Sequence, residues 1–342
     1  GYIVGGYFES SSIDLGNGIS LTNKGKSDGM IIKYNARGEV EWAEGIGGIY
    51  NYDDEITSVA GTSDGGYIVG GLLGSSIDLG NGISLSGNSD GMIIKYNARG
   101  EVEWAEGIGG TYVDKINSVS ETSDGGYIVG GYFNSNIDLG NGISLTNKGY
   151  DDGMIIKYNA TGEVEWAEGI GGTNRDYTNS IAETSDGGYI VGGYFGSSSI
   201  DLGNGISLTN KGSTVYSDGM LIKLEKIERP TPTVKKAYGI GESDHDYIKS
   251  VAETSDGGYI VGGYFRSSSI DLGNRISLVN KGYDDGMIIK YNATGEVEWA
   301  EGIGGTSDEK ITSVAGTSDG GYIVGGYFES SSIDLGNGIS LT

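Results

Sequence analysis

One acidic residue precedes the same short apolar segment in each of five copies of a repeated sequence. The five are Asp54, Asp114, Asp176, Asp246 and Glu309. Hard cations such as Ca²⁺ bind about six to eight oxygen ligands, so carboxylates gathered at one opening would form a candidate metal site. Short acidic side chains also accept hydrogen bonds from the backbone N–H groups of tight turns. Because no D-x-D-x-D-G loop is present, the sequence favours the turn interpretation: we expect no cofactor, and Ca²⁺ remains the alternative.

The segment before these acids is the most variable part of the repeat. After GIG or GIGG the five copies read IYNYDDE, TYVDK, TNRDYTN, ESDHDYIK and TSDEK. Loops carry binding residues more often than the framework that holds them, and this mixture of aromatic, cationic and amide side chains suits sugars or peptides. The candidate ligand-binding residues are Tyr50, Tyr52, Tyr112, Arg175, Tyr177, His245 and Tyr247.

Side chains for catalysis are scarce in this sequence. His245 is the only histidine, cysteine is absent, and no G-x-S-x-G elbow follows a strand into a helix. Two carboxylates about 5 to 9 Å apart are sufficient for a glycosidase. A carbohydrate-active enzyme, or a glycan-binding protein that uses these carboxylates, is therefore the alternative function. Since the acids recur in every copy, whereas an active site needs an asymmetric pocket, we expect no enzymatic activity.

A second set of aspartates lies in the repeated sequence SDGG, which predicts a tight turn between two strands. These residues are Asp64, Asp124, Asp186, Asp256 and Asp319. The turn alone accounts for an aspartate at this position, so we assign them a structural role.

An internal repeat must position all of these residues. The phrase GYIVGG recurs every 60 to 70 residues, with its tyrosine at Tyr2, Tyr67, Tyr127, Tyr189, Tyr259 and Tyr322. Between these points the blocks IDLGNGISL, DGMIIKYNA, GEVEWAEGIGG and ITSVAETSDG return in the same order. Short runs of β-branched and aromatic residues bounded by Gly, Asn, Asp and Ser predict strands, and Asn-Gly between apolar residues predicts a hairpin. Each copy is therefore expected to form four main strands, with a hairpin inserted between the second and the third.

Composition excludes several classes of protein. The chain has 342 residues with 66 glycines and only 2 prolines, but no G-X-Y triplet, which excludes collagen. Its formal net charge of −25 argues against nucleic acid as a partner, because phosphate backbones require clustered Lys and Arg. The absence of cysteine removes disulfides and thiolate metal sites. No apolar run approaches the roughly 20 residues that span a bilayer, so we expect no membrane insertion.

Four-stranded units in tandem suggest a β-propeller, in which each unit is one blade. The sequences ITSVAGTSDGGYIVGGYF and DGMIIKYNARGEVEWAEGIGG resemble the bacterial and archaeal β-propeller repeat of the SBBP type. The shared features are a Y-x-V-x-G strand, a D-x-[FM]-[VI]-x-K strand and a tryptophan-containing strand that closes on G-G, and they recur along essentially the whole chain. This resemblance implies a propeller on a secreted or surface protein, with ITSVA as the innermost strand, EVEWAEGI as the outermost strand and no catalytic residues to transfer.

We therefore expect an all-β fold: a single β-propeller domain over residues 1–342, with five blades of about 64 residues. The expected blades are residues 1–49 completed by 306–320, then 50–110, 111–172, 173–241 and 242–305. A ring of six or seven blades completed between chains is one alternative. A β-solenoid is another, which the unequal repeat lengths disfavour.

The last 22 residues of the chain, 321–342, repeat the first 22 letter for letter. If residues 306–320 complete the first blade, residues 321–342 are a surplus strand and hairpin that compete with 1–22 for one place. This duplication predicts strand exchange, pairing with another molecule, or a chain that is one part of a longer array.

The outer strand predicts contacts between blades and one weak blade. Its tryptophans are Trp42, Trp104, Trp166 and Trp299, and we expect them to pack between neighbouring blades. The fourth copy has Lys236 at this position and carries both prolines, Pro230 and Pro232. Because proline cannot donate to a β-ladder, we expect this blade to be the loosest.

Together these features predict a non-enzymatic extracellular or cell-surface protein with a structural, adhesion or assembly role. Its expected partners are further copies of the same chain, or a surface glycan or protein.

Overall fold

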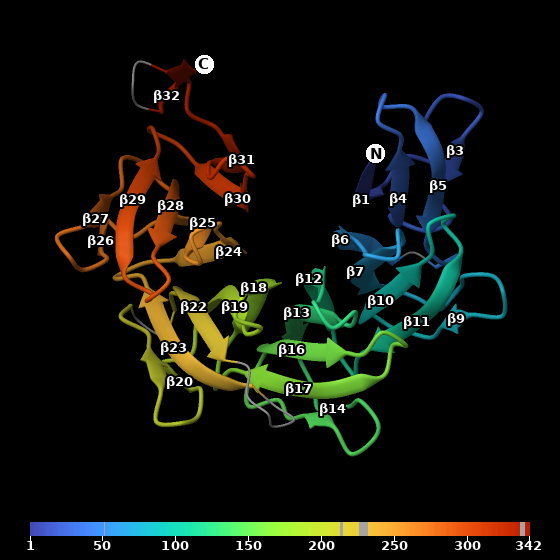
Figure 1. Cartoon of the computed structure of the whole chain (residues 1–342), viewed down its shortest axis with the longest axis horizontal. Helices are drawn as coiled ribbons and strands as arrows, with labels where there is room; N and C mark the ends of the chain where they lie inside the picture. Colours follow the sequence, from blue (N-terminus) through green and yellow to red (C-terminus); the bar gives the residue numbers. More distant parts are fainter. Residues whose placement is uncertain (51, 213–214, 226–231, 336–338) are drawn as a thin grey trace. The chain divides into compact units, whose positions relative to one another are not determined.

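The computed structural model describes residues 1–50, 52–212, 215–225, 232–335 and 339–342, and these residues form strands, turns and loops without a helix (Figure 1). In the described residues no helix is long and apolar enough to cross a membrane. The all-β expectation is confirmed.

Four complete four-stranded antiparallel sheets repeat along the chain, as the block order predicts. The second sheet contains β6 (Glu55–Gly61), β7 (Tyr67–Leu73), β10 (Asp90–Tyr96) and β11 (Val102–Ile108). The third sheet contains β12 (Lys115–Glu121), β13 (Tyr127–Phe133), β16 (Asp152–Tyr158) and β17 (Val164–Ile170). The fourth sheet contains β18 (Asp176–Glu183), β19 (Tyr189–Phe195), β22 (Asp218–Glu225) and β23 (Thr233–Ile240). The fifth sheet contains β24 (Asp246–Glu253), β25 (Tyr259–Phe265), β28 (Asp285–Tyr291) and β29 (Val297–Ile303).

The two ends of the chain form incomplete sheets. The first sheet has three strands, β1 (Tyr2–Phe8), β4 (Asp28–Tyr34) and β5 (Val40–Ile46). The terminal pair has two, β30 (Glu309–Gly316) and β31 (Tyr322–Phe328). We expected residues 306–320 to complete the blade of residues 1–49. In the structure β30 pairs with β31, the duplicated segment that follows it, and Lys310 lies opposite Tyr327. This difference has a local cause, because β30 and β31 are joined by the same SDGG turn that joins β6 to β7.

Each copy also forms the predicted hairpin between its second and third main strands. The hairpins pair β2 (Ser12–Asp14) with β3 (Ser20–Thr22), β8 (Ile77–Asp78) with β9 (Ser84–Leu85), β14 (Ile137–Asp138) with β15 (Ser144–Leu145), β20 (Ser199–Asp201) with β21 (Ser207–Thr209), β26 (Ser269–Asp271) with β27 (Ser277–Val279), and β32 (Ile333–Asp334) with β33 (Ser340–Leu341). Asn17 and Gly18 have φ of 53° and 76°, the left-handed conformation that an Asn-Gly turn requires. Arg275 adopts the same conformation, with φ of 67°, in the copy that lacks the glycine.

The chain divides into two compact units, which are described separately. Unit 1 comprises residues 1–147 and 153–169, and unit 2 comprises residues 148–152 and 170–342.

Within each unit, the first strand of one sheet packs on the glycines of the preceding sheet's second strand. A Cβ atom on Gly70 of β7 would lie 2.4 Å from Val119 of β12, and one on Gly262 of β25 would lie 2.5 Å from Val314 of β30. Only glycine allows this close approach. The repeated GG pair of YIVGG is therefore a packing requirement of the repeat.

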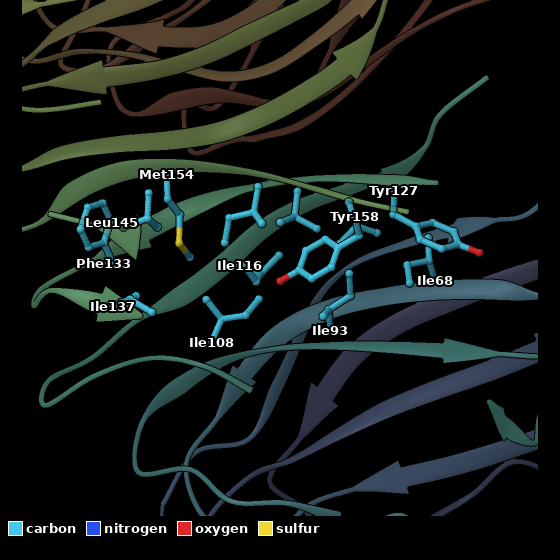
Figure 2. Close-up of a cluster of buried hydrophobic side chains, with 13 residues drawn as sticks. Ile68, Ile93, Ile108, Ile116, Tyr127, Phe133, Ile137, Leu145, Met154 and Tyr158 are labelled. Carbon is cyan, nitrogen blue, oxygen red and sulfur yellow. The ribbon is translucent and has the colours of Figure 1, made fainter. Parts of the chain in front are cut away.

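The hydrophobic core lies between consecutive sheets. One cluster joins Ile68 and Ile93 of the second sheet to Ile116, Tyr127 and Tyr158 of the third (Figure 2). In unit 2, equivalent clusters join the fourth sheet to the fifth and the fifth sheet to the terminal pair. Sheets that bury their faces against neighbours in this way stabilise one another, as in other repeat proteins.

The tryptophans of the outer strand extend this packing, as predicted. Trp42 contacts Tyr67 and Tyr96 of the second sheet, with ring centroids 5.8 and 6.3 Å apart. In the same way Trp104 packs on Tyr127 and Tyr158 of the third sheet, and Trp299 packs on Tyr322 of the terminal pair. Trp166 is 8% exposed.

The fourth sheet differs where tryptophan is missing. Lys236 pairs with Lys223 across the sheet, at the register position of Trp42 opposite Lys33. Tyr238 partly fills the space by packing on Tyr291, with ring centroids 5.6 Å apart, and a cavity of about 290 Å³ remains beside these residues. Pro232 immediately precedes β23, whereas Pro230 lies outside the described residues. The expectation that this blade is the loosest stays a prediction.

Candidate functional site

The five acids at the start of the first strands are buried, and they bind the loop that precedes them and the loop after the second strand. Asp54, Asp114, Asp176 and Asp246 are 0% exposed and Glu309 is 1% exposed. Asp176 accepts hydrogen bonds from the N–H groups of Gly172 at 2.8 Å and Gly196 at 3.1 Å. The Gly305 and Ser330 N–H groups bond to Glu309 in the same manner, at 2.6 and 3.0 Å. These contacts are those that the turn interpretation requires.

In several sheets the third main strand also begins with a buried aspartate. In the fourth sheet this residue is Asp218, whose charge acts on Asp246. Asp218 accepts a hydrogen bond from the Lys211 N–H at 2.8 Å through Oδ2, whereas its Oδ1 is buried without a hydrogen-bond partner in the described residues. Burial raises the pKa of Asp218 to about 6. Burial also raises the pKa of Asp246 to about 7, and the charge of Asp218 adds to this increase. The two carboxyl groups are therefore coupled acids that hold protons more tightly than exposed ones.

These paired acids do not form a recognisable metal centre. In the described ranges, no group of three or more His, Asp or Glu side chains is arranged to hold a metal ion. Metal binding therefore stays a prediction for the weak candidates Asp54, Asp114, Asp176, Asp246 and Glu309.

The SDGG aspartates lie in turns, as predicted, and also bind a buried lysine. Asp64 accepts from the N–H of Gly66 at 2.8 Å, and its other oxygen lies 2.8 Å from Nζ of Lys95. Lys95, whose side chain is 2% exposed, also pairs with Glu103 at 2.9 Å. The Lys95 ammonium and the Thr62 hydroxyl lower the pKa of Asp64 to about 2. Lys157 and Lys290 occupy the same position in the third and fifth sheets.

In the second, third and fifth sheets this lysine clamp connects the turn before the second strand, the third strand and the fourth strand. Sequence reasoning missed this clamp. Its signal is the lysine within the otherwise apolar strand DGMIIKY, because a buried lysine needs carboxylate partners.

The seven candidate ligand-binding residues fall into two groups. Tyr50, Tyr52 and Tyr112 are exposed in unit 1. Arg175, Tyr177, His245 and Tyr247 line one cleft in unit 2, which the structure extends with further residues. The added lining residues are Tyr150, Asn174, Tyr194, Gly196, Val215, Tyr216 and Ser217. The cleft has a volume of about 570 Å³.

Stacked tyrosines form one wall of this cleft. The rings of Tyr177 and Tyr194 stack with centroids 4.8 Å apart, and Tyr247 meets Tyr194 edge-on at 4.5 Å. Such pairs fix ring positions because aromatic quadrupoles favour offset-stacked and edge-to-face contacts. The hydroxyl of Tyr177 bonds to Asp151, whose carboxylate also lies 3.3 Å from Nε of Arg175.

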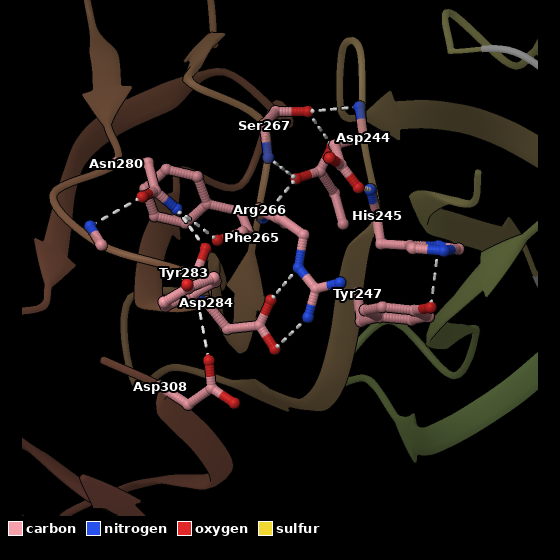
Figure 3. Close-up of polar contacts among 12 residues, drawn as sticks. Asp244, His245, Tyr247, Phe265, Arg266, Ser267, Asn280, Tyr283, Asp284 and Asp308 are labelled. Carbon is pink, nitrogen blue, oxygen red and sulfur yellow. Dashed lines mark hydrogen bonds and ion pairs between the residues drawn. The ribbon is translucent and has the colours of Figure 1, made fainter. Parts of the chain in front are cut away.

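His245 stacks on Tyr247, with ring centroids 5.6 Å apart and an interplanar angle of 16° (Figure 3). Its Nδ1 accepts a hydrogen bond from the N–H of Ser217 at 3.2 Å and lies 2.9 Å from the hydroxyl of Tyr247. Burial lowers the pKa of His245. We therefore assign the neutral form at neutral pH with its proton on Nε2, which leaves that nitrogen as a donor.

Lys249 contacts two rings of this wall, Tyr194 and Tyr247, and lies at a β-bulge. The register of β24 and β25 shifts between Ile248 and Ser250, so that Lys249 is the extra residue, and bulges redirect side chains. Its Nζ is 5.5 Å from the ring centroid of Tyr194, 5.6 Å from that of Tyr247 and 5.8 Å from that of Tyr264. Burial, followed by the charge of Lys310, lowers the pKa of Lys249.

The other cations next to Lys249 have acidic partners. Arg266 makes two bonds to the buried carboxylate of Asp284, at 2.7 and 3.1 Å (Figure 3). Lys310 lies 2.8 Å from the same carboxylate. For Lys249, by contrast, the described residues provide the three rings and no carboxylate within ion-pair distance. The repeat alignment carries a signal for this residue, because the other copies have Thr57, Asn117, Asn179 and Thr312 here.

Comparisons with known proteins add little. No protein-family model and no curated protein matches the sequence. Among solved structures, the holo form of the pyranose dehydrogenase PQQ domain from Coprinopsis cinerea is similar with a TM-score of 0.37 and 9% identity, over 90% of this chain and 87% of that one. Sqt1 from Chaetomium thermophilum is similar with a TM-score of 0.31 and 10% identity, over 78% of this chain and 75% of that one. At such low scores neither similarity supports a conclusion about cofactor or activity.

Proposed function

We propose that this chain is a non-catalytic, extracellular β-propeller of SBBP-type repeats that assembles with further copies of itself through its duplicated segment. The observation that carries the proposal is the division of one sheet between the chain ends. The first sheet has the second, third and fourth strands of the repeat, whereas the terminal pair has the first and second. The second strand is present in both parts, as β1 and as the identical β31.

In the assembled form, β31 of one copy replaces β1 of the next copy beside β4. Because the two strands are identical, the register is the one that β1 has now, in which Tyr2 faces Tyr34 and Phe8 faces Asp28. The product is a four-stranded sheet in the order β30–β31–β4–β5, the same order as in the four complete sheets. With this composite sheet each copy has five blades, and exchange of an identical element is a low-cost route to assembly.

Burial of apolar side chains favours the exchange. Ile323 is 66% exposed in the terminal pair, whereas its counterparts Ile68 and Ile260 are 0% exposed. A Cβ atom on Gly325 of β31 would meet only Ser313, at 4.0 Å, while one on Gly5 of β1 would lie 2.6 Å from Ile56. Next to the second sheet of another copy, β31 would regain the packing that the other second strands have.

An ion pair would form across the new interface. Asp319 occupies the SDGG position before β31 but has no lysine partner in the described residues; it bonds only to Thr317 and to the N–H of Gly321. Lys33 of β4 lies 3.5 Å from Glu41, and it is the clamp lysine of the first sheet. In the composite sheet Asp319 reaches Lys33, as Asp64 reaches Lys95 at 2.8 Å.

A role without catalysis is favoured because the repeated acids accept hydrogen bonds from their own loops. The net charge of −25 suits a solvent-exposed surface. The extracellular location rests on the resemblance to SBBP-type repeats.

Charge reversal tests the assembly directly. Asp319→Lys and Lys33→Asp should each reduce self-association, measured by light scattering over a concentration series, and the chain that carries both should recover it. Asp271→Lys, which makes the same charge change on an exposed hairpin of the fifth sheet, is the matched control and should assemble normally. Removal of residues 321–342 should leave monomers. A full-length chain that is monomeric at every concentration, or a double variant that fails to recover, would refute the proposal.

A further inference from the structure

We propose that the cleft lined by Tyr177, Tyr194, Tyr247, His245 and Arg175 binds an acidic saccharide, a pyranose that carries a carboxylate. This inference is independent of self-assembly, because every residue that it uses belongs to unit 2. It adds a ligand class to a protein whose proposed function requires only contacts between its own copies.

The cleft has the dimensions and composition of a small-molecule site. Its volume of about 570 Å³ lies within the range of ligand pockets, roughly 300 to 1,000 Å³. Tyr177 and Tyr194, whose rings stack, provide an aromatic wall of the kind on which the apolar face of a sugar ring packs. Polar groups lie around this wall, including Arg175, Asn174 and the imidazole of His245.

Lys249 determines the charge of the ligand. A cage of three tyrosine rings would by itself attract a cation, but here the chain's own ammonium is already placed 5.5 to 5.8 Å from the three centroids. An external cation would be repelled by this charge, whereas a carboxylate would be attracted to it. In a chain with a net charge of −25, a cation without a carboxylate partner marks a place for an anionic group.

Neighbouring charges do not neutralise Lys249. Arg266 and Lys310 share the buried carboxylate of Asp284, whereas Lys249 makes no ion pair with it in the described residues and has Lys310 as a neighbouring charge. Asp151 is engaged by Tyr177 and Arg175. The Nε2–H of His245 is available as a further donor to a sugar oxygen.

A saccharide fits this site better than an acidic peptide. The recognition elements are ring faces held by mutual stacking, together with side-chain donors. A peptide that bound by strand addition would instead rely on backbone hydrogen bonds to the open edge of a strand, whereas this cleft offers aromatic rings and polar side chains.

The test measures binding by titration calorimetry and by chemical-shift changes, with galacturonic acid and galactose as probes. These sugars differ only in a carboxylate at C6. The acid should bind, and galactose should bind at least about tenfold more weakly. A short acetylated poly-glutamate peptide serves as the second anionic probe and should not compete with galacturonic acid.

Two substitutions test the roles of Lys249 and Tyr194. Each introduces the side chain that another copy of the repeat has at the same position. Lys249→Thr follows Thr57 and Thr312, and Tyr194→Leu follows Leu72. Each should weaken binding of galacturonic acid at least about tenfold. Tyr132→Leu makes the same change in the third sheet and should have no effect, while circular dichroism verifies that all three variants are folded.

Several results would overturn the inference. Equal affinity for both sugars would refute the role of charge, and binding of neither sugar would refute the ligand class. Competition by the peptide at similar affinity would show a general anion site. Unchanged binding in both Lys249→Thr and Tyr194→Leu would show that the ligand occupies another place.

Discussion

The substitution Ile323→Lys tests the composite sheet through its apolar contribution. Ile323 is 66% exposed in the terminal pair, and the residues at the same position of the second, third and fifth sheets, Ile68, Ile128 and Ile260, are 0% exposed. Assembly would therefore bury about two-thirds of this side chain. Complete burial of an isoleucine contributes about 1.5 to 3 kcal/mol, so the lost part is about 1 to 2 kcal/mol. The association constant should fall by about 5 to 30 fold from this loss alone.

The introduced lysine adds to the effect, because its ammonium would have to enter an apolar interface between sheets. We therefore expect a decrease of at least about tenfold in the association constant, measured by sedimentation equilibrium. The folded monomer should keep its stability within about 0.5 kcal/mol, since the residue is exposed in it.

Ile49→Lys is the matched control, because Ile49 is 78% exposed and lies outside the strands. Its association constant should equal that of the parent chain. If Ile323→Lys assembles as well as the parent, or if both variants lose assembly to the same degree, β31 does not enter a composite sheet.

Three further predictions concern stability. Lys236→Trp together with Tyr238→Glu gives β23 the residues of the other outer strands at these two positions and should fill the cavity of about 290 Å³, raising the free energy of unfolding by about 1 to 2 kcal/mol in urea titrations; a decrease would show that the cavity has adapted to lysine. Arg275→Gly relieves a left-handed backbone with φ of 67° and should stabilise by about 1 kcal/mol on the same assay, whereas no gain would mean that the turn is unstrained. Because the pKa values of Asp218 and Asp246 are raised to about 6 and about 7 in the folded state, their stabilising effect is complete below the unfolded value near 4 and is lost as the pH rises through 6 to 7. The melting temperature should accordingly fall between pH 5 and pH 8, with a shallower fall in Asp246→Asn; equal slopes would contradict the assignment.

Local sequence predicted the strands and turns well. Asn17 and Gly18 adopt positive φ because an Asn-Gly hairpin turn requires it, and each SDGG segment forms the predicted turn. Repetition also revealed the role of Trp42 and Trp104, since a tryptophan at one position of four of the five outer strands is expected to find equivalent partners.

Long-range pairing was harder to predict. The sequence at residues 311–315 is equally compatible with β1 and with β31, because both partners have identical letters. Local connection by a tight turn decides this case, and the structure pairs β30 with β31. Hydrophobic pattern and residue identity carry no information on this choice.

The cleft was only partly predictable. Variable loops identified Arg175, Tyr177, His245 and Tyr247, which the structure brings together. Lys249 was missed because a strand residue was not considered a site candidate, although the β-bulge directs its side chain toward the tyrosines. The grouping also depends on Tyr194, whose repeated YIVGGY motif gives no sign of a special role in one copy.

The lysine clamp has a mechanical consequence. Lys157 is 2% exposed and is bound by Asp124 and Glu165, which come from the turn before the second strand and from the fourth strand. Loss of one strand under tension would leave the buried ammonium of Lys157 without one of its carboxylate partners, which is unfavourable. The second, third and fifth sheets should therefore resist pulling and then each rupture as one piece. In a force-extension trace, such a chain would lengthen in discrete steps of about 20 nm, the extended length of one repeat.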